Sequence, residues 1–134
     1  MGENTNTCQG EVLLRILLAD ESEMTRFALA TLLEQRPGWV VVGEVVSAQK
    51  LFPEVEATSP DLVLLSWNLP NLRIENIIPT MAAKFPGISV IVLSGRPEAR
   101  PQAMAAGAKA FVSKADPPDR LLETVKYIER LTQG

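Results

Sequence analysis

Short apolar runs alternate with longer segments of helical periodicity along most of the chain. Five such runs, each followed by a turn or by polar residues, occupy positions 14–19, 39–45, 62–65, 90–93 and 110–112. The run at 62–65 is uninterrupted, which is typical of a strand covered on both faces. Between the runs, apolar residues recur three and four positions apart and predict helices. Five strands alternating with five helices indicate a parallel, doubly wound α/β sheet.

Capping residues and prolines predict where the helices begin and end. Ser22 is the predicted N-cap of the first helix and Asp116 of the last. Pro53, Pro79 and Pro101 fall inside or near the start of the three middle helices, which predicts late starts or kinks there. The first and last helices lack an internal proline, and each has a predicted buried stripe. The stripes are Ala28, Leu29, Leu32 and Leu33 with Met24 or Thr25, and Leu121, Leu122, Val125 and Ile128 with Leu131 or Thr132.

Polar residues follow four of the five predicted strands. Asp20 and Glu21 come after the first strand, Ser66 after the third, Ser94 after the fourth and Lys114 after the fifth. Ligands and chemistry collect just beyond the carboxyl ends of the strands in an open parallel sheet. We therefore expect two acids, two hydroxyls and a lysine to form one polar cluster at one edge of the sheet.

This arrangement resembles the receiver domain of two-component response regulators, and the resemblance covers residues 12–133. It implies a flavodoxin-like sheet of five parallel strands in the order 2-1-3-4-5, with five helices. The segment 86–114 is most similar to receivers of the NarL/LuxR branch, which usually precede a helix-turn-helix DNA-binding domain. Residues 1–11 are polar, and their composition predicts a disordered N-terminal tail.

The resemblance also implies roles for the five residues of the predicted cluster and for two residues near it. They are Asp20, Glu21 and the backbone carbonyl of Asn68 as magnesium ligands, Ser94 and Lys114 as phosphoryl contacts, Phe111 as an aromatic switch, and Ser66 at the position of the phosphate-accepting Asp. The serine is a departure from the family pattern. A serine hydroxyl is a weak nucleophile without an adjacent base, and the chain contains no histidine. We expect Ser66 not to accept phosphate.

The same replacement changes the expected metal chemistry. Two unit charges about 4 Å apart interact by about 4 kcal/mol at an effective dielectric of about 20, before desolvation. A neutral hydroxyl at Ser66 should therefore weaken a Mg²⁺ site. The alternative is that Asp20 and Glu21 pair with Lys114 instead of a metal. Phe111 is equally interpretable as a fixed core aromatic, and Trp67 lies next to the predicted site.

The loop after Ser66 departs from the pattern as well. Family members often have a glycine after the proline, whereas here Pro70 is followed by Asn71. Asparagine tolerates positive φ better than most residues that have a side chain. Asn71 is therefore the residue best suited to replace that glycine.

Composition limits the possible functions. The 134 residues suit one domain, and a net charge of −3 without a basic cluster argues against direct nucleic-acid binding. The absence of histidine removes the usual general base, and we expect no enzymatic activity. The single cysteine, Cys8, excludes an internal disulfide and favours a reducing cytosol. No apolar run approaches the roughly 20 residues that span a bilayer, so we predict no membrane segment and a cytoplasmic protein.

The leading hypothesis is a receiver-like signalling domain that is not phosphorylated at Ser66 and acts through protein contacts. A histidine kinase or an output domain, including a DNA-binding one, is the expected partner. The resemblance also implies a homodimer through the first and fifth, or the fourth and fifth, helices. One alternative is a conventional phosphate-accepting receiver whose Asp was replaced. A flavodoxin-type cofactor-binding protein is the other, and three acids at 20, 21 and 23 would repel its phosphate.

Overall fold

The computed structural model describes residues 13–133 and has a five-stranded parallel sheet at its centre. The strand order is β2-β1-β3-β4-β5, which confirms the predicted 2-1-3-4-5 topology. The strands are β1 (Leu14–Ala19), β2 (Trp39–Val45), β3 (Leu62–Ser66), β4 (Ser89–Ser94) and β5 (Ala110–Ser113). The predicted tail at 1–11, including Cys8, lies outside the described residues.

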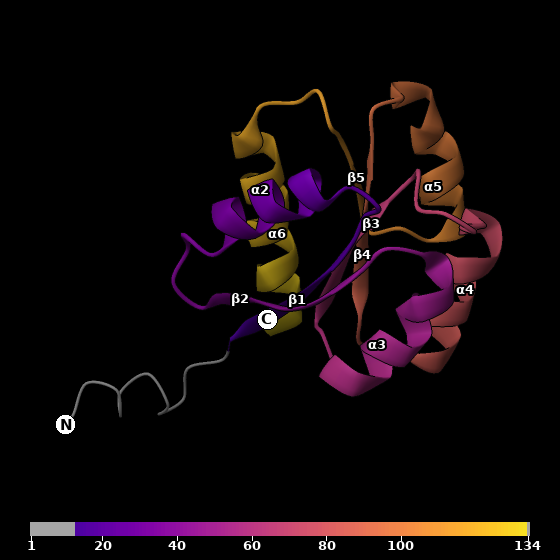
Figure 1. Cartoon of the computed structure of the whole chain (residues 1–134), viewed down its shortest axis with the longest axis horizontal. Helices are drawn as coiled ribbons and strands as arrows, with labels where there is room; N and C mark the ends of the chain where they lie inside the picture. The colour runs from indigo at the N-terminus through magenta and orange to yellow at the C-terminus, as the bar shows by residue number, and fades with distance from the viewer. Residues whose placement is uncertain (1–12, 134) are drawn as a thin grey trace.

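Five helices cover the two faces of the sheet (Figure 1). One face carries α2 (Glu23–Leu33) and α6 (Pro118–Gln133), and the other carries α3 (Leu51–Thr58), α4 (Ile74–Lys84) and α5 (Arg100–Ala106). Two short 3₁₀ turns, η1 (Ala48–Lys50) and η2 (Pro97–Ala99), precede α3 and α5. Among residues 13–133, no helix has both the length and the apolar character needed to cross a lipid bilayer.

The central strand β3 shows why the sheet needs helices on both faces. All five of its residues are buried, as the uninterrupted apolar run predicts. Leu62 and Leu64 pack in the core beneath α2 and α6, and Val63 and Leu65 pack in the core beneath α3, α4 and α5. This alternation follows from the two-residue period of a strand.

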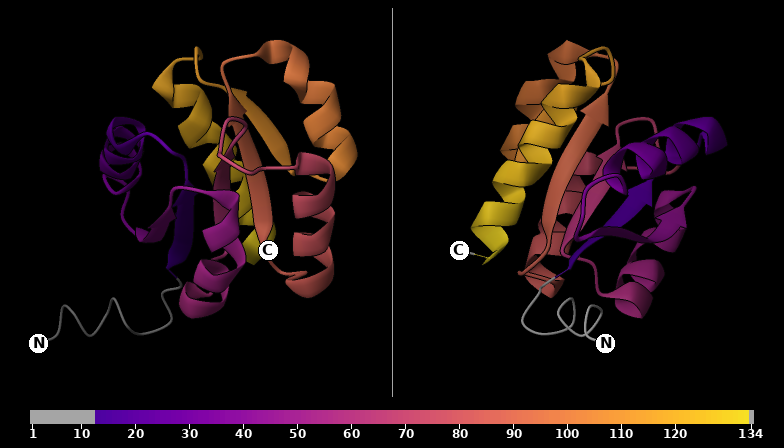
Figure 2. Two further views of the ribbon diagram at one scale, coloured as in Figure 1. Left: turned by 45° about the vertical axis from the view of Figure 1, so that its right-hand side comes forward. Right: turned by 90° about the vertical axis from the view of Figure 1, so that its left-hand side faces the viewer.

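The first and last helices are less deeply buried than their sequence stripes predict. In α2 only Leu33 is buried, while Met24 and Ala28 are exposed. Figures 1 and 2 show α2 crossing α6 at a steep angle rather than lying alongside it, so most of the α2 stripe has no helix to cover it. In α6 the stripe ends at Ile128, and the prediction for Leu131 is wrong because its side chain is 51% exposed.

The prolines act differently in the three middle helices. The helices α3 and α5 start late, after η1 and η2, as predicted from Pro53 and Pro101. For the third helix the sequence predicts a late start or a kink. The late start does not occur, because α4 begins at Ile74 and includes Pro79 in its interior, and the kink stays a prediction. Pro79 is exposed, so its ring stands on the solvent side of the helix.

The sheet register brings the strand ends together. Ala19 pairs with Leu65, Ser66 with Leu93, and Ser94 with Ser113. The four strands β1, β3, β4 and β5 therefore end at nearly the same level. The residues that follow them share one edge of the sheet, as the sequence predicts.

Candidate functional site

Lys114 connects three strand ends through its side-chain ammonium. Its Nζ donates hydrogen bonds to Asp20 Oδ2 at 2.9 Å and to Ser66 Oγ at 3.2 Å. Asp20 and Ser66 are buried, with exposed fractions of 2% and 1%, whereas the Lys114 side chain is 31% exposed. The structure therefore contains the Lys114–Asp20 pair that the sequence offers as the alternative to a metal. We call Lys114, Asp20 and Ser66 the lysine bridge.

The side-chain oxygens of Asp20, Ser66 and Ser94 also accept hydrogen bonds from backbone amides. Asp20 Oδ1 accepts a hydrogen bond from Ser22 N at 2.8 Å, so both oxygens of the carboxylate have donors. Ser66 Oγ accepts a second bond from Asn68 N at 3.3 Å. Ser94 Oγ accepts one from Arg96 N at 2.9 Å, so this hydroxyl closes the turn after β4.

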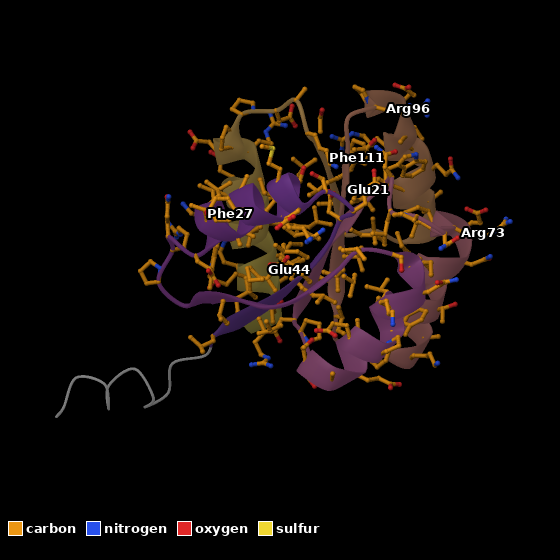
Figure 3. All side chains as sticks on the ribbon, viewed as in Figure 1. Glu21, Phe27, Glu44, Arg73, Arg96 and Phe111 are labelled. Atoms are coloured by element: carbon orange, nitrogen blue, oxygen red, sulfur yellow. The ribbon has the colours of Figure 1, made fainter. Side chains whose placement is uncertain are left out.

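The donor set at this edge of the sheet is small for a hard divalent cation. Within residues 13–133, no group of three or more His, Cys, Asp or Glu side chains is placed to hold a metal ion. Asp20 supplies one carboxylate that is already paired, Ser66 supplies a neutral oxygen, and Glu21 is exposed (Figure 3). Magnesium prefers carboxylate oxygens in near-ideal octahedral geometry.

Phe111 is held in the core by an arginine. Its ring is only 5% exposed, and the Arg100 guanidinium carbon lies 5.0 Å from the ring centroid. Arg100 Nη2 also makes a long hydrogen bond of 3.4 Å to the Phe111 carbonyl oxygen. This cation–π contact joins α5 to the edge strand β5. Phe111 therefore lies in the core in this structure, and its role as an aromatic switch stays a prediction.

The loop after Ser66 is anchored on both sides. Trp67 is half-buried, and its backbone N–H donates to Leu93 O at 2.8 Å. Ala48 N donates to Pro70 O at 2.9 Å. Asn71 has a φ of 66°, in the left-handed region that asparagine tolerates better than most residues with a side chain.

Three arginines near these elements escaped the sequence prediction. Arg26 donates from Nη1 to Asp20 O and from Nε to Glu44 Oε1 at 2.7 Å, so it fastens the start of α2 to β2. Arg15 donates from Nε to Ser59 O at the left-handed end of α3. Arg100 covers Phe111. These contacts join residues distant in sequence, so no local spacing signals them.

The last predicted role at this edge is that of Asp116. Its carboxylate was expected to cap the last helix. Asp116 Oδ2 instead accepts a hydrogen bond from Ser113 N at 3.2 Å, and Asp116 N donates to Ser113 O at 3.0 Å. The residue therefore closes the β5–α6 loop next to Lys114.

Comparison with known proteins agrees with this geometry. The family described as "Response regulator receiver domain" matches residues 16–126. An uncharacterized transcriptional regulatory protein, YhcZ of Bacillus subtilis, is 29% identical over 113 residues, which are 83% of this chain and 53% of YhcZ. The transcriptional activator protein ExaE of Pseudomonas putida is 30% identical over 115 residues, 84% of this chain and 54% of ExaE. The chain spans about half the length of these relatives.

The solved structures give the same result. The crystal structure of a LuxR-family two-component response regulator from Aurantimonas sp. SI85-9A1 matches with a TM-score of 0.79 at 25% identity. The match covers 87% of this chain and 84% of that one.

Removal of the lysine ammonium should destabilise the protein. We expect Lys114→Met to lower the unfolding free energy by about 1–3 kcal/mol, because the buried Asp20 carboxylate then keeps only its bond from Ser22. Adding Asp20→Asn should recover part of that loss, since a neutral amide needs no cation. Urea denaturation of the four proteins measures both effects. Lys109→Met, at an exposed position, is the matched control, and an equal loss there would contradict this reading of Lys114.

The contact between Arg100 and Phe111 predicts a smaller effect on stability. Arg100→Ala should lower the unfolding free energy by about 0.5–1 kcal/mol and shift the ring-proton NMR signals of Phe111. Arg96→Ala is the control, because the bond from Arg96 to Ser94 uses the backbone amide. Unchanged Phe111 signals in Arg100→Ala would show that the ring is held by packing alone.

Proposed function

The chain belongs to the response regulator receiver domain family, and from this premise we propose that it is a receiver that signals without phosphorylation at Ser66. The observation that carries the proposal is the lysine bridge. Ser66 Oγ is buried and accepts hydrogen bonds from Lys114 and Asn68. The chain has no histidine to act as a base, and a serine hydroxyl is a poor nucleophile without one.

The proposal includes the loss of tight magnesium binding. The ammonium of Lys114 already neutralises Asp20, and a dication would have to displace it. Ser66 offers no charge in return, and Glu21 alone remains as a free carboxylate at this edge among the described residues. A Mg²⁺ ion bound this weakly would contribute little to holding a phosphoryl group at the site.

The proposed output is a change of protein contacts. The matched segments make up only about half of the relatives named as transcriptional regulators, so we propose that the domain controls a DNA-binding output domain in such a protein. The domain itself, with a net charge of −3, is not proposed to bind nucleic acid. A kinase that docks on it without transferring phosphate fits the same scheme.

We further propose a homodimer through the face formed by α5 and α6. Met104 on α5 is 40% exposed, and Tyr127 and Leu131, one turn apart on α6, are 52% and 51% exposed. These two helices flank the edge strand β5 from opposite sides of the sheet, and exposed apolar side chains beside a sheet edge favour protein contacts. The other face open to this role, between α2 and α6, is interrupted by a groove.

Phosphorylation is tested directly with acetyl phosphate and magnesium, followed by intact mass measurement. We expect no added phosphoryl group on the unaltered protein. The Ser66→Asp variant should gain one if the surrounding residues are still competent, and Ser66→Asn is the isosteric control without an acceptor. A phosphoryl group on the unaltered protein would contradict the proposal. If only Ser66→Asp is modified, the serine alone prevents phosphorylation. This is the result expected if a conventional receiver had its acceptor replaced.

The proposed dimer predicts a concentration-dependent mass in sedimentation experiments. Tyr127→Glu should shift the protein to monomer, because it places a charge in the centre of the α6 contact. Phe27→Glu on α2, also at an exposed aromatic, should leave the dimer unchanged. A monomer at all concentrations, or a dimer lost only in Phe27→Glu, would refute the proposed face.

A further inference from the structure

A groove separates α2 from α6 on the face that these helices cover. Its volume is about 770 Å³. In Figure 1 the ribbon of α2 crosses that of α6 steeply instead of running along it. The floor is the sheet itself, at Leu93 and Val112. The walls are Leu29 and Leu32 from α2, and Pro118 and Leu121 from the start of α6. A volume of roughly 300–1,000 Å³ with a mainly apolar lining is typical of small-molecule sites.

The ionisable side chains at the groove already have hydrogen-bond partners within the protein. Lys114 and Asp116 are its two ionisable lining residues. The ammonium of Lys114 is bound to Asp20 and Ser66, and the Asp116 carboxylate accepts the Ser113 amide. An anionic ligand would have to compete with Asp20 for the ammonium of Lys114, whereas an apolar neutral ligand would bury surface without disturbing either set of hydrogen bonds.

The outer edge of the groove can adapt to an occupant. Met24 and Phe27 line it from α2 and are 80% and 72% exposed, and Figure 3 shows Phe27 on α2 in front of α6. Methionine is flexible and polarisable, and an aromatic ring contributes a large apolar surface. Both side chains would lose exposure to water over a bound molecule. Leu29 and Leu32, which line the groove from α2, are only partly buried, so they too would gain contacts with a bound molecule.

From these observations we propose that the groove between α2 and α6 binds a neutral, predominantly apolar small organic molecule. Binding itself does not depend on the proposed function. A regulatory role for the bound molecule does rest on the proposed function. The groove ends at Lys114 and at the β5–α6 loop, next to the lysine bridge. A ligand there would press on the segment 113–118, which links the bridge to α6. The molecule would then serve as an input to a receiver that takes no phosphate.

The test uses the neutral fluorescent probe N-phenyl-1-naphthylamine with the 134-residue chain. We expect saturable binding of one probe per chain, accompanied by shifts of the Lys114 and Asp116 amide signals in NMR. Ala28→Trp fills the groove from an exposed position on α2 and should weaken binding at least tenfold. Thr31→Trp, at a second exposed lining position, repeats the test if the first variant folds poorly.

The matched control is Ala82→Trp, at an exposed position on α4 on the opposite face of the sheet. It should bind the probe as the unaltered protein does. Failure to bind, or equal binding by Ala28→Trp and Ala82→Trp, would overturn the proposal. Loss of a homodimer in Ala28→Trp, without a change in probe binding, would assign the groove to a second copy of the chain and overturn it as well. None of these readouts involves phosphorylation, so the proposed function can fail independently.

Discussion

The hydrogen bonds from Lys114 to Asp20 and Ser66 hold the functional edge of this protein together. A carboxylate as deeply buried as Asp20 needs compensation, because an isolated buried charge is strongly unfavourable. The ammonium supplies it at 2.9 Å, and its second bond reaches the hydroxyl that ends β3. A carboxylate at residue 66 would compete for the same cation. The neutral serine leaves the lysine to Asp20.

This arrangement has consequences beyond the three residues. The bridge joins the ends of β1, β3 and β5, and β5 is an edge strand that would otherwise be held by β4 on one side only. Arg100 fixes the same strand from α5 through Phe111. On the α6 side, Asp116 closes the loop that follows Lys114. The edge strand β5 and the loop after it are thus held by contacts from three directions, and the groove between α2 and α6 opens onto that loop.

Much of this could be predicted from the sequence, because periodicity and strand-end chemistry are local signals. The buried run at 62–65 and the cluster of Asp20, Ser66 and Lys114 follow from them, whereas the strand order was implied by the family resemblance together with right-handed crossovers. The tilt of α2 could not be predicted, since it depends on packing that leaves Ala28 exposed despite its place in an apolar stripe. Leu131 is exposed for a similar reason, and α4 passes through Pro79 because that proline faces solvent. The contacts of Arg15, Arg26 and Arg100 connect distant segments and have no local signature.

The central claim is that an internal ammonium replaces the metal at Asp20. The most direct measurement is a magnesium titration followed by the NMR amide signals of Asp20, Ser66 and Lys114, on the unaltered protein and on Ser66→Asp. The account predicts that the signals of the unaltered protein do not move through the millimolar range, whereas those of Ser66→Asp shift and saturate. Saturable shifts in the unaltered protein at low magnesium would show that the lysine yields to the metal, and would contradict the account.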